Sequence, residues 1–366
     1  MSLRVHHYCA HRTGNSGDDL VALALRQTLE RRLGPCAFTT IAVSERGRGT
    51  TGPVGLCPEN IERSNSEADL VLVGGSNLLE PRKPRHSDDC NIPLLLDGQA
   101  LVRLQRPLLL AGMGTGSSFG KPIRAYTRRA GQNLRALFER ALAHAVRDTP
   151  TVQRLAKIGI QTQCAGCPVA FLTDRPVQAQ DARRPLIVSF PPARILHRFG
   201  GPAFMALALR YLRWLRAQGI ALVVTLHEAT DRETARVLLG GLQPAVEVFY
   251  TDDLPALIDR FEQCRGVIGF RLHAALLGMG LGKPIIPVGL DWRGLGFIKT
   301  IGADDISIRP FRFGQLKKLQ SLTTRLLEND PLLLARLRLA KQSLFAGHEE
   351  FFRQAALAFT PRAQAG

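Results

Sequence analysis

An arginine and a histidine two residues apart, Arg271 and His273, follow a short apolar run at Gly266–Phe270. The run predicts a buried strand, and the small apolar residues at 274–279 predict a helix after it. In open α/β sheets ligands bind at such junctions, because backbone N–H groups and the positive end of the helix dipole face the crevice. A guanidinium and a titratable imidazole at this point would form an anion site with a proton donor attached.

The same pair also has a purely structural interpretation. His273 would then hydrogen-bond a neighbouring carbonyl, and the pair would cap the end of the sheet without binding a ligand. The local pattern leaves both interpretations open. A further strand is predicted at Pro284–Val288, after the small-residue helix.

A glycine-containing loop near the N-terminus offers backbone amides to a crevice of the same kind. It follows a strand predicted at Leu3–Cys9 and precedes a helix. Gly14 and Gly17 allow close approach of the backbone, and Ser16 or Asp18 is expected to cap the helix. A plain strand-to-helix turn with a good cap would explain the same residues.

Two more glycine turns follow predicted strands. Ser76 and Asn77 lie in the turn after the strand at Ala68–Val73. The turn at 112–116 brings to mind a dinucleotide fingerprint, but its third glycine falls one place early and no acidic residue ends a following strand. A nicotinamide or flavin site is therefore not expected.

Composition indicates a globular protein that binds anions. The chain has 366 residues, of which 45% are hydrophobic and 22% charged, with a net charge of +17. No apolar run approaches the roughly 20 residues of a membrane span, and no signal peptide is recognisable, so a cytoplasmic location is expected. The charge favours phosphorylated substrates, acidic polymers or an anionic membrane surface, while no specific nucleic-acid motif is present.

The cysteines predict free thiols and no metal centre. There are seven, an odd number, scattered along a chain without an export signal. Cys164 and Cys167 have the spacing of a metal or redox pair, but no second pair completes a zinc site.

Strands and helices alternate along both halves, which predicts two doubly wound parallel sheets whose carboxyl ends face one cleft. Residues 44–66 are expected to form a surface loop, 80–93 a basic loop that could serve as an acceptor-binding lid, and 123–144 a helix. The expected division is an N-terminal Rossmann-like domain at 1–175, a linker at 176–185, a C-terminal Rossmann-like domain at 186–330 and C-terminal helices at 331–366.

These motifs, in this order, resemble the polysaccharide pyruvyl transferase family over roughly residues 3–300. The similarity rests on the opening loop 14–18, on Arg147-Asp148 followed by hydroxyl residues, and on the stretch 271–293. An aspartate often stands in the family where this chain has Cys167. The cluster 291–293, Asp-Trp-Arg, replaces the usual Tyr-Asp-x-Lys.

The resemblance implies two Rossmann-like domains arranged like those of the B-type glycosyltransferases. It implies an enzyme that moves the enolpyruvyl group of phosphoenolpyruvate onto two hydroxyls of a sugar, in a cell-surface polysaccharide or its precursor, and leaves a pyruvate ketal and phosphate. Such a reaction needs neither a metal nor a cofactor besides the co-substrate phosphoenolpyruvate. The resemblance implies that Arg271 binds the donor and that His273 is the catalytic acid. Arg147 is a candidate second clamp on the donor, and Gly14, Asn15, Ser76 and Asn77 would line the floor of the donor site. His227 could serve as the base, although His227 and Glu228 are as easily a satisfied pair in a turn.

Two other functions fit the same pattern. A glycosyltransferase would use the cleft for the diphosphate of a nucleotide sugar, and a non-catalytic relative would only bind anionic polymers or membranes. For the transferase, the expected acceptor is a saccharide or a lipid-linked saccharide. A lipid-linked acceptor would bring the basic protein to the inner face of an anionic membrane.

Overall fold

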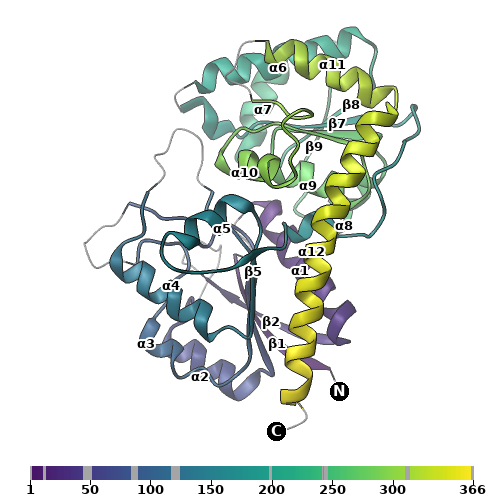
Figure 1. The fold of residues 1–366 in the computed structure, drawn as a ribbon. Coiled ribbons are helices and arrows are strands. Elements are labelled where there is room, and N and C mark those ends of the chain that lie inside the picture. The colour runs from purple at the N-terminus through teal and green to yellow at the C-terminus, as the bar shows by residue number, and fades with distance from the viewer. Residues whose placement is uncertain are drawn as a thin grey trace.

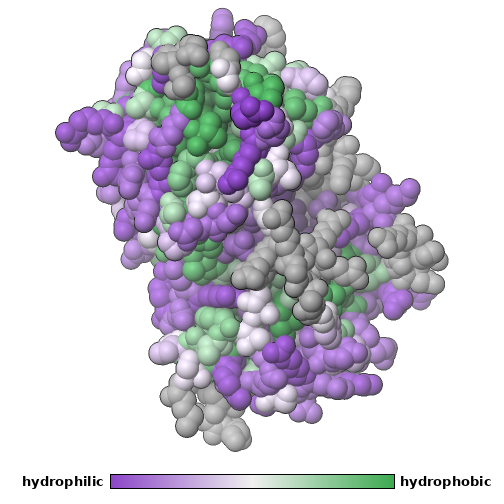
Figure 2. Space-filling model, turned by 180° about the vertical axis from the view of Figure 1, so that it is seen from behind, coloured by the Kyte–Doolittle hydropathy of each residue, from purple (hydrophilic) through white to green (hydrophobic). Residues whose placement is uncertain are grey.

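The computed structural model describes residues 2–10, 14–43, 52–83, 90–116, 124–197, 200–240, 242, 246–309 and 314–363. Its two parallel sheets lie in the two halves of the chain, one above the other in Figure 1. Hydrophilic side chains cover much of the face in Figure 2, and apolar ones gather over the C-terminal half, at the top. Among the helices that the structure describes, none combines the length and apolar character that a membrane span needs.

The N-terminal sheet has the strand order β2-β1-β3-β4-β5-β6, with every pair parallel. Its central strands are continuous apolar runs, because helices cover both faces of such a sheet. The strands are β1 (Leu3–Cys9), β2 (Cys36–Ala42), β3 (Leu70–Gly74), β4 (Leu108–Met113), β5 (Ala143–Val146) and β6 (Gln163–Cys164).

The C-terminal sheet has the order β11-β10-β7-β8-β9 and is also parallel throughout. Two parallel α/β sheets are the fold class that the sequence predicts. The strands are β7 (Leu186–Ser189), β8 (Leu222–Thr225), β9 (Glu247–Phe249), β10 (Gly266–Gly269) and β11 (Ile285–Pro287).

Helices cover the sheets, and several begin directly after a strand. In the N-terminal half they are α1 (Ser16–Leu33), α2 (Pro58–Glu67), α3 (Gly98–Leu101), α4 (Arg128–Arg140), α5 (Thr149–Ala156) and the 3₁₀ turn η1 (Pro168–Phe171). In the C-terminal half they are η2 (Ala193–His197), α6 (Gly201–Ala217), α7 (Asp231–Leu239), α8 (Leu254–Glu262), α9 (Leu272–Gly280), α10 (Trp292–Thr300), α11 (Gln315–Leu327) and α12 (Pro331–Ala363).

Each sheet has one point where the strand order reverses. In the N-terminal sheet it lies between β1 and β3, and in the C-terminal sheet between β7 and β10. Connections leave such a pair of strands in opposite directions, so a crevice opens at their carboxyl ends. The loop at Gly14–Asn15, the turn at Ser76 and the pair Arg271 and His273 all follow strands that flank these two points.

The two halves share one apolar core. It runs from the α1 side of the N-terminal sheet through η1 and α9 into the C-terminal half, while a second core lies between the N-terminal sheet and α2, α3 and α4. Helix α12 lies along both halves in Figure 1 and packs on α1, β5 and α11. Its buried Lys341 donates hydrogen bonds to the carbonyls of Thr173, Arg175 and Gly280.

Two secondary-structure predictions were wrong in part. The helix expected at 123–144 is α4, which ends at Arg140, and the strand β5 begins at Ala143. Pairing of Ala143–Val146 with β4 and β6 overrides the local helical pattern.

The loop expected at 44–66 contains helix α2 from Pro58 onward. Its buried face includes Asn60, whose side-chain amide donates to the carbonyl of Gly55, and Ser64, whose hydroxyl hydrogen-bonds the hydroxyl of Tyr8. A face that is buried through polar side chains has no apolar periodicity to reveal it. The rest of that loop at 44–51, and 84–89 of the proposed lid, lie outside the described residues.

Candidate functional site

The crevices of the two sheets meet through direct contacts between their loops. Asn15 forms an isolated antiparallel bridge with Glu228, in the loop after β8. The amide of Ser16 donates to the carbonyl of His227 at 3.3 Å, and the Ser16 hydroxyl lies 3.3 Å from His227 Nδ1. The start of α1 and the end of β8 therefore form one wall of a shared site.

His273 lies at the start of α9, against Gly17 of α1. It is 7% exposed, and a Cβ added to Gly17 would lie 1.9 Å from His273 Nδ1. Only a glycine at position 17 allows this approach. The Nε2 atoms of His273 and His227 have no hydrogen-bond partner among the described residues.

Both imidazoles are held in the neutral form. Burial, followed by the charge of Arg271, lowers the pKa of His227 to about 3. Burial lowers the pKa of His273 well below its usual value, and the charges of Arg147 and Arg293 add to this effect. A negative charge that enters beside either ring would raise its pKa.

Arg147 brings a second cation to the site from the end of β5. It is 5% exposed and donates from Nε to Asp148 Oδ2 at 3.1 Å. A terminal nitrogen donates to Asn77 Oδ1, and the Asn77 amide donates in turn to the carbonyl of Gly116. Asp148 caps α5 by accepting from the amide of Thr151 at 2.9 Å.

The loops that carry Ser76 and Gly14 have left-handed backbone angles, and a hydrogen bond between residues far apart in the sequence joins the Ser76 loop to α1. Ser76 has φ of 55°, a left-handed conformation rare for residues other than glycine, and its hydroxyl donates to Asp18 Oδ1 at 2.6 Å. Gly14 has φ of 78°. Asn15 caps α1 by accepting from the amide of Gly17 at 3.0 Å, so the prediction that Ser16 or Asp18 caps this helix was wrong.

Arg271 is the N-cap of α9, and its side chain is bound within the protein. Its terminal nitrogens donate to Glu228 Oε1 at 2.8 Å and to Asp231 Oδ2, and its Nε donates to the carbonyl of Phe190 at 3.3 Å. Glu228 also pairs with Arg194 at 2.6 Å. In this arrangement Arg271 holds the loop that carries His227. The role of Arg271 in donor binding stays a prediction.

Arg293 lies in the first turn of α10. It belongs to the cluster 291–293, but no role was predicted for it from the sequence. It pairs with Asp291, the N-cap of that helix, and its backbone nitrogen lies 3.0 Å from the position of a Cβ on Gly116. The charge of Arg293 and the charge of Arg147 both lower the pKa of His273. The signal available in the sequence was a basic residue in the first helical turn after a strand and an acidic cap.

The cysteines do not join the chemistry of the site. Burial raises the pKa of Cys167 to about 11 and that of Cys164 to about 11, so both thiols stay protonated near neutral pH. No cluster of three or more metal-ligating side chains occurs within the described ranges.

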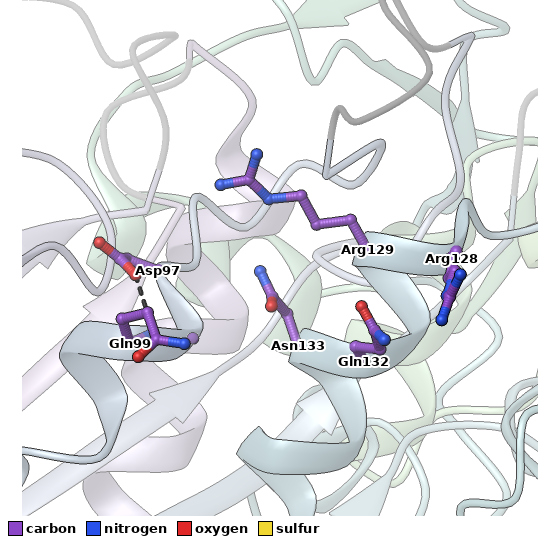
Figure 3. Close-up of a pocket in the computed structure, with 7 residues that line it drawn as sticks. Asp97, Gln99, Arg128, Arg129, Gln132 and Asn133 are labelled. Carbon is purple, nitrogen blue, oxygen red and sulfur yellow. Dashed lines mark hydrogen bonds between the residues drawn. The ribbon is translucent and has the colours of Figure 1, made fainter.

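A polar hollow of about 440 Å³ lies elsewhere, between α3 and α4 (Figure 3). Asp97 caps α3 through the amide of Gln99 at 2.9 Å, and Asn133 donates to the carbonyl of Leu96 at 3.0 Å. These polar groups serve the surrounding helices, while Arg128 and Arg129 are exposed at its rim. We assign no chemistry to this hollow.

Comparison with solved structures shows the fold. A structure described as a UDP-N-acetylglucosamine 2-epimerase from Listeria monocytogenes is 15% identical with a TM-score of 0.54, covering 92% of this chain and 91% of that one. The MnaA–UDP co-structure from S. aureus is 12% identical with a TM-score of 0.50, covering 92% and 91%. E. coli heptosyltransferase WaaC with ADP-2-deoxy-2-fluoro heptose is 13% identical with a TM-score of 0.44, covering 88% and 99%.

Sequence comparison identifies the family. No curated protein sequence gives a match to the chain. A model of the polysaccharide pyruvyl transferase family matches residues 15–291, a range that begins at the cap of α1 and ends at the cap of α10. That range includes Arg147, His227 and the 271–273 pair, and the chain therefore belongs to the polysaccharide pyruvyl transferase family.

Proposed function

We propose that the protein transfers the enolpyruvyl group of phosphoenolpyruvate to two hydroxyls of a sugar, in a cell-surface polysaccharide or its precursor. The products would be a pyruvate ketal and inorganic phosphate. Membership of the family makes the protein a transferase. The observation that best supports this donor is His273, a buried neutral imidazole at a helix N-terminus whose pKa is lowered by the charges of two arginines.

The donor suits the charge of this site. Phosphoenolpyruvate carries a carboxylate and a phosphate, which call for guanidinium groups and backbone amides in a site shielded from water. The charges of Arg147 and Arg293 both act on His273, and the first turns of α1 and α9 add amides. Gly14, Asn15, Ser76 and Asn77 would line the floor below the donor. Arg271, whose charge is paired with Glu228 and Asp231, would hold the loop of His227 beside the donor.

The chemistry then requires three proton movements, of which the first two accompany the attack of the first hydroxyl on carbon 2. Carbon 3 of the donor must gain a proton so that carbon 2 becomes electrophilic, and the attacking hydroxyl must lose one. His273, protonated once the donor anion is bound, would supply the first proton through its unpartnered Nε2. His227 would accept the proton of the hydroxyl. The second hydroxyl attacks carbon 2 as the phosphate leaves, the departing phosphate takes up the proton of that hydroxyl, and the ketal closes.

A ligand-binding experiment tests the donor. The melting temperature of the protein is measured with phosphoenolpyruvate, UDP and a UDP-sugar. Stabilisation by phosphoenolpyruvate and not by UDP is expected. Stabilisation by UDP alone would favour the nucleotide-sugar glycosyltransferase, and binding of polyanions with a steep salt dependence but no turnover would favour the non-catalytic relative.

A substitution then separates binding from chemistry. His273→Gln keeps much of the side-chain volume but cannot act as an acid. We expect the variant to bind phosphoenolpyruvate and to release phosphate at least about 100-fold more slowly in the presence of acceptor. Full turnover in His273→Gln would exclude the imidazole as the acid.

A further inference from the structure

A cavity of about 440 Å³ lies between α5 of the N-terminal half and α10 of the C-terminal half, next to the site already described. The cavity and that site share residues. Asp148 borders the cavity while its Oδ2 accepts from Arg147 at 3.1 Å, and Gly116 borders it while contacting the backbone of Arg293. A molecule in the cavity would therefore lie beside the groups that would hold the donor.

One wall of the cavity is apolar and flat. Trp292, the first residue of α10, is 40% exposed and lines the cavity together with Pro150 and Leu295. An exposed tryptophan in a concave site points to a ligand with an apolar face. The C–H face of a sugar ring provides such a surface, and the ring hydroxyls stay free to point elsewhere.

The rim of the cavity carries positive charge. Arg154 donates to the carbonyl of Thr115 at 3.1 Å, and Lys299 donates to Gln153 Oε1 at 3.2 Å. Both acceptors are neutral, so these bonds do not cancel the two charges.

The acidic side chains that line the cavity have basic or hydroxyl partners. Asp148 accepts from Arg147 and from the Thr151 hydroxyl, and Asp304 accepts from Arg309. They do not offset the charges of Arg154 and Lys299. The cavity thus combines an aromatic wall with cations at its edge.

We propose that this cavity is the acceptor subsite and that the acceptor is a saccharide bearing an anionic group, either a carboxylate or a phosphate. The inference rests on the proposed function, because it places the acceptor beside the donor. The sugar ring packs on Trp292, and its anionic group binds Lys299 and Arg154. The reacting hydroxyl pair then faces the donor site past Asp148 and Gly116.

Binding of simple probes tests this inference without turnover. The probes are a neutral methyl hexoside, the corresponding methyl hexuronide and the hexose 1-phosphate, measured by saturation-transfer NMR and by tryptophan fluorescence. We expect the wild type to bind one or both anionic probes more tightly than the neutral one. Whichever of the two binds more tightly identifies the anion as carboxylate or phosphate.

Substitutions locate the probe. Lys299→Gln should weaken binding of the anionic probe by about tenfold, the loss expected for one hydrogen bond to a charged group, and Trp292→Leu should weaken binding of all three probes. Arg213→Gln is the control, because it removes one charge from an exposed side chain on α6, a helix that contributes no residue to the lining of the cavity.

The outcomes separate this inference from the proposed function. Equal binding of neutral and anionic probes, no binding of any probe by the wild type, or equal losses in Lys299→Gln and Arg213→Gln would overturn the acceptor assignment. Stabilisation by phosphoenolpyruvate is measured on the same proteins. If Lys299→Gln keeps that stabilisation but loses the anionic probe, the loss comes from the subsite and not from a loosened contact between the halves.

Discussion

At the scale of single residues, the electrostatics of His273 couple donor binding to a proton. Burial, Arg147 and Arg293 hold its pKa well below the usual value, and an incoming anion would counter the two arginines and raise it. Between the lower and the raised pKa, binding takes up a proton. The affinity for phosphoenolpyruvate should therefore fall as pH rises, by at most about tenfold per pH unit for one proton.

Calorimetry in buffers of different ionisation enthalpy measures that proton uptake directly. His273→Gln should show less uptake than the wild type across the same pH range. His227 also has a low pKa, so His227→Gln is measured alongside to assign the remaining proton. An uptake that is unchanged in both variants would contradict this coupling.

Gly17 sets the position of the same imidazole. An added methyl group would lie 1.9 Å from His273 Nδ1, so the ring must move in Gly17→Ala. We expect a loss of at least about tenfold in phosphate release, because a displacement of about 1 Å at a reacting group is costly. Gly131→Ala in α4 is the matched control, since the nearest atom to its added methyl group, Arg135 Nη1, lies 3.8 Å away. The control should gain about 0.5–1 kcal/mol of stability and keep its activity. Equal activity of Gly17→Ala and Gly131→Ala would show that catalysis does not require the His273 ring in its position against Gly17.

At the scale of elements, the sequence predicted the features that depend on residues close together in the chain. An apolar run followed by Arg271, and glycines beside Asn15, were enough to place both loops at strand ends, and the structure has strands and helices there. The bonds of Arg271 to Glu228 and Asp231 were not predictable, because those carboxylates come from another strand-to-helix connection. Strand β2 was missed for a similar reason, since its residues are only partly buried and gain their pairing from β1.

Helix α12 should contribute stability through one buried lysine. Lys341 is 3% exposed, and its ammonium donates to the carbonyls of Thr173, Arg175 and Gly280. It thereby joins the segment between the sheets to the end of α9. Lys341→Met would leave these carbonyls without that donor, at a cost of about 1–3 kcal/mol for each one kept from water.

Chemical denaturation measures this cost. Lys317→Met on α11 is the control, because Lys317 is exposed, and it should change stability by less than about 0.5 kcal/mol. Equal stability of the two variants would show that water replaces the ammonium group of Lys341.

At the scale of the whole molecule, the two halves are held in contact at the site by pairs far apart in the sequence. The amide of Thr149 donates to the Thr300 hydroxyl at 3.0 Å, and Ser16 contacts His227. These contacts bring the loops at the two crevices together. Under the proposed function, a donor bound by residues of both halves and an acceptor placed between the halves would meet there without a large rearrangement.

The net charge of +17 belongs to this scale as well, because no single site accounts for it. If the acceptor is carried by a lipid, the charge would hold the protein at an anionic membrane surface, where basic residues gain about 1 kcal/mol each. We expect co-sedimentation with vesicles that contain phosphatidylglycerol, and little with phosphatidylcholine alone. The association should weaken as salt is raised, because the screening length is about 10 Å at 0.1 M ionic strength and shorter above it. Lys299→Gln removes only one charge and should sediment like the wild type, while its binding of an anionic sugar is impaired. Sedimentation without preference for the anionic lipid would mean that the charge serves the soluble substrates and not the membrane.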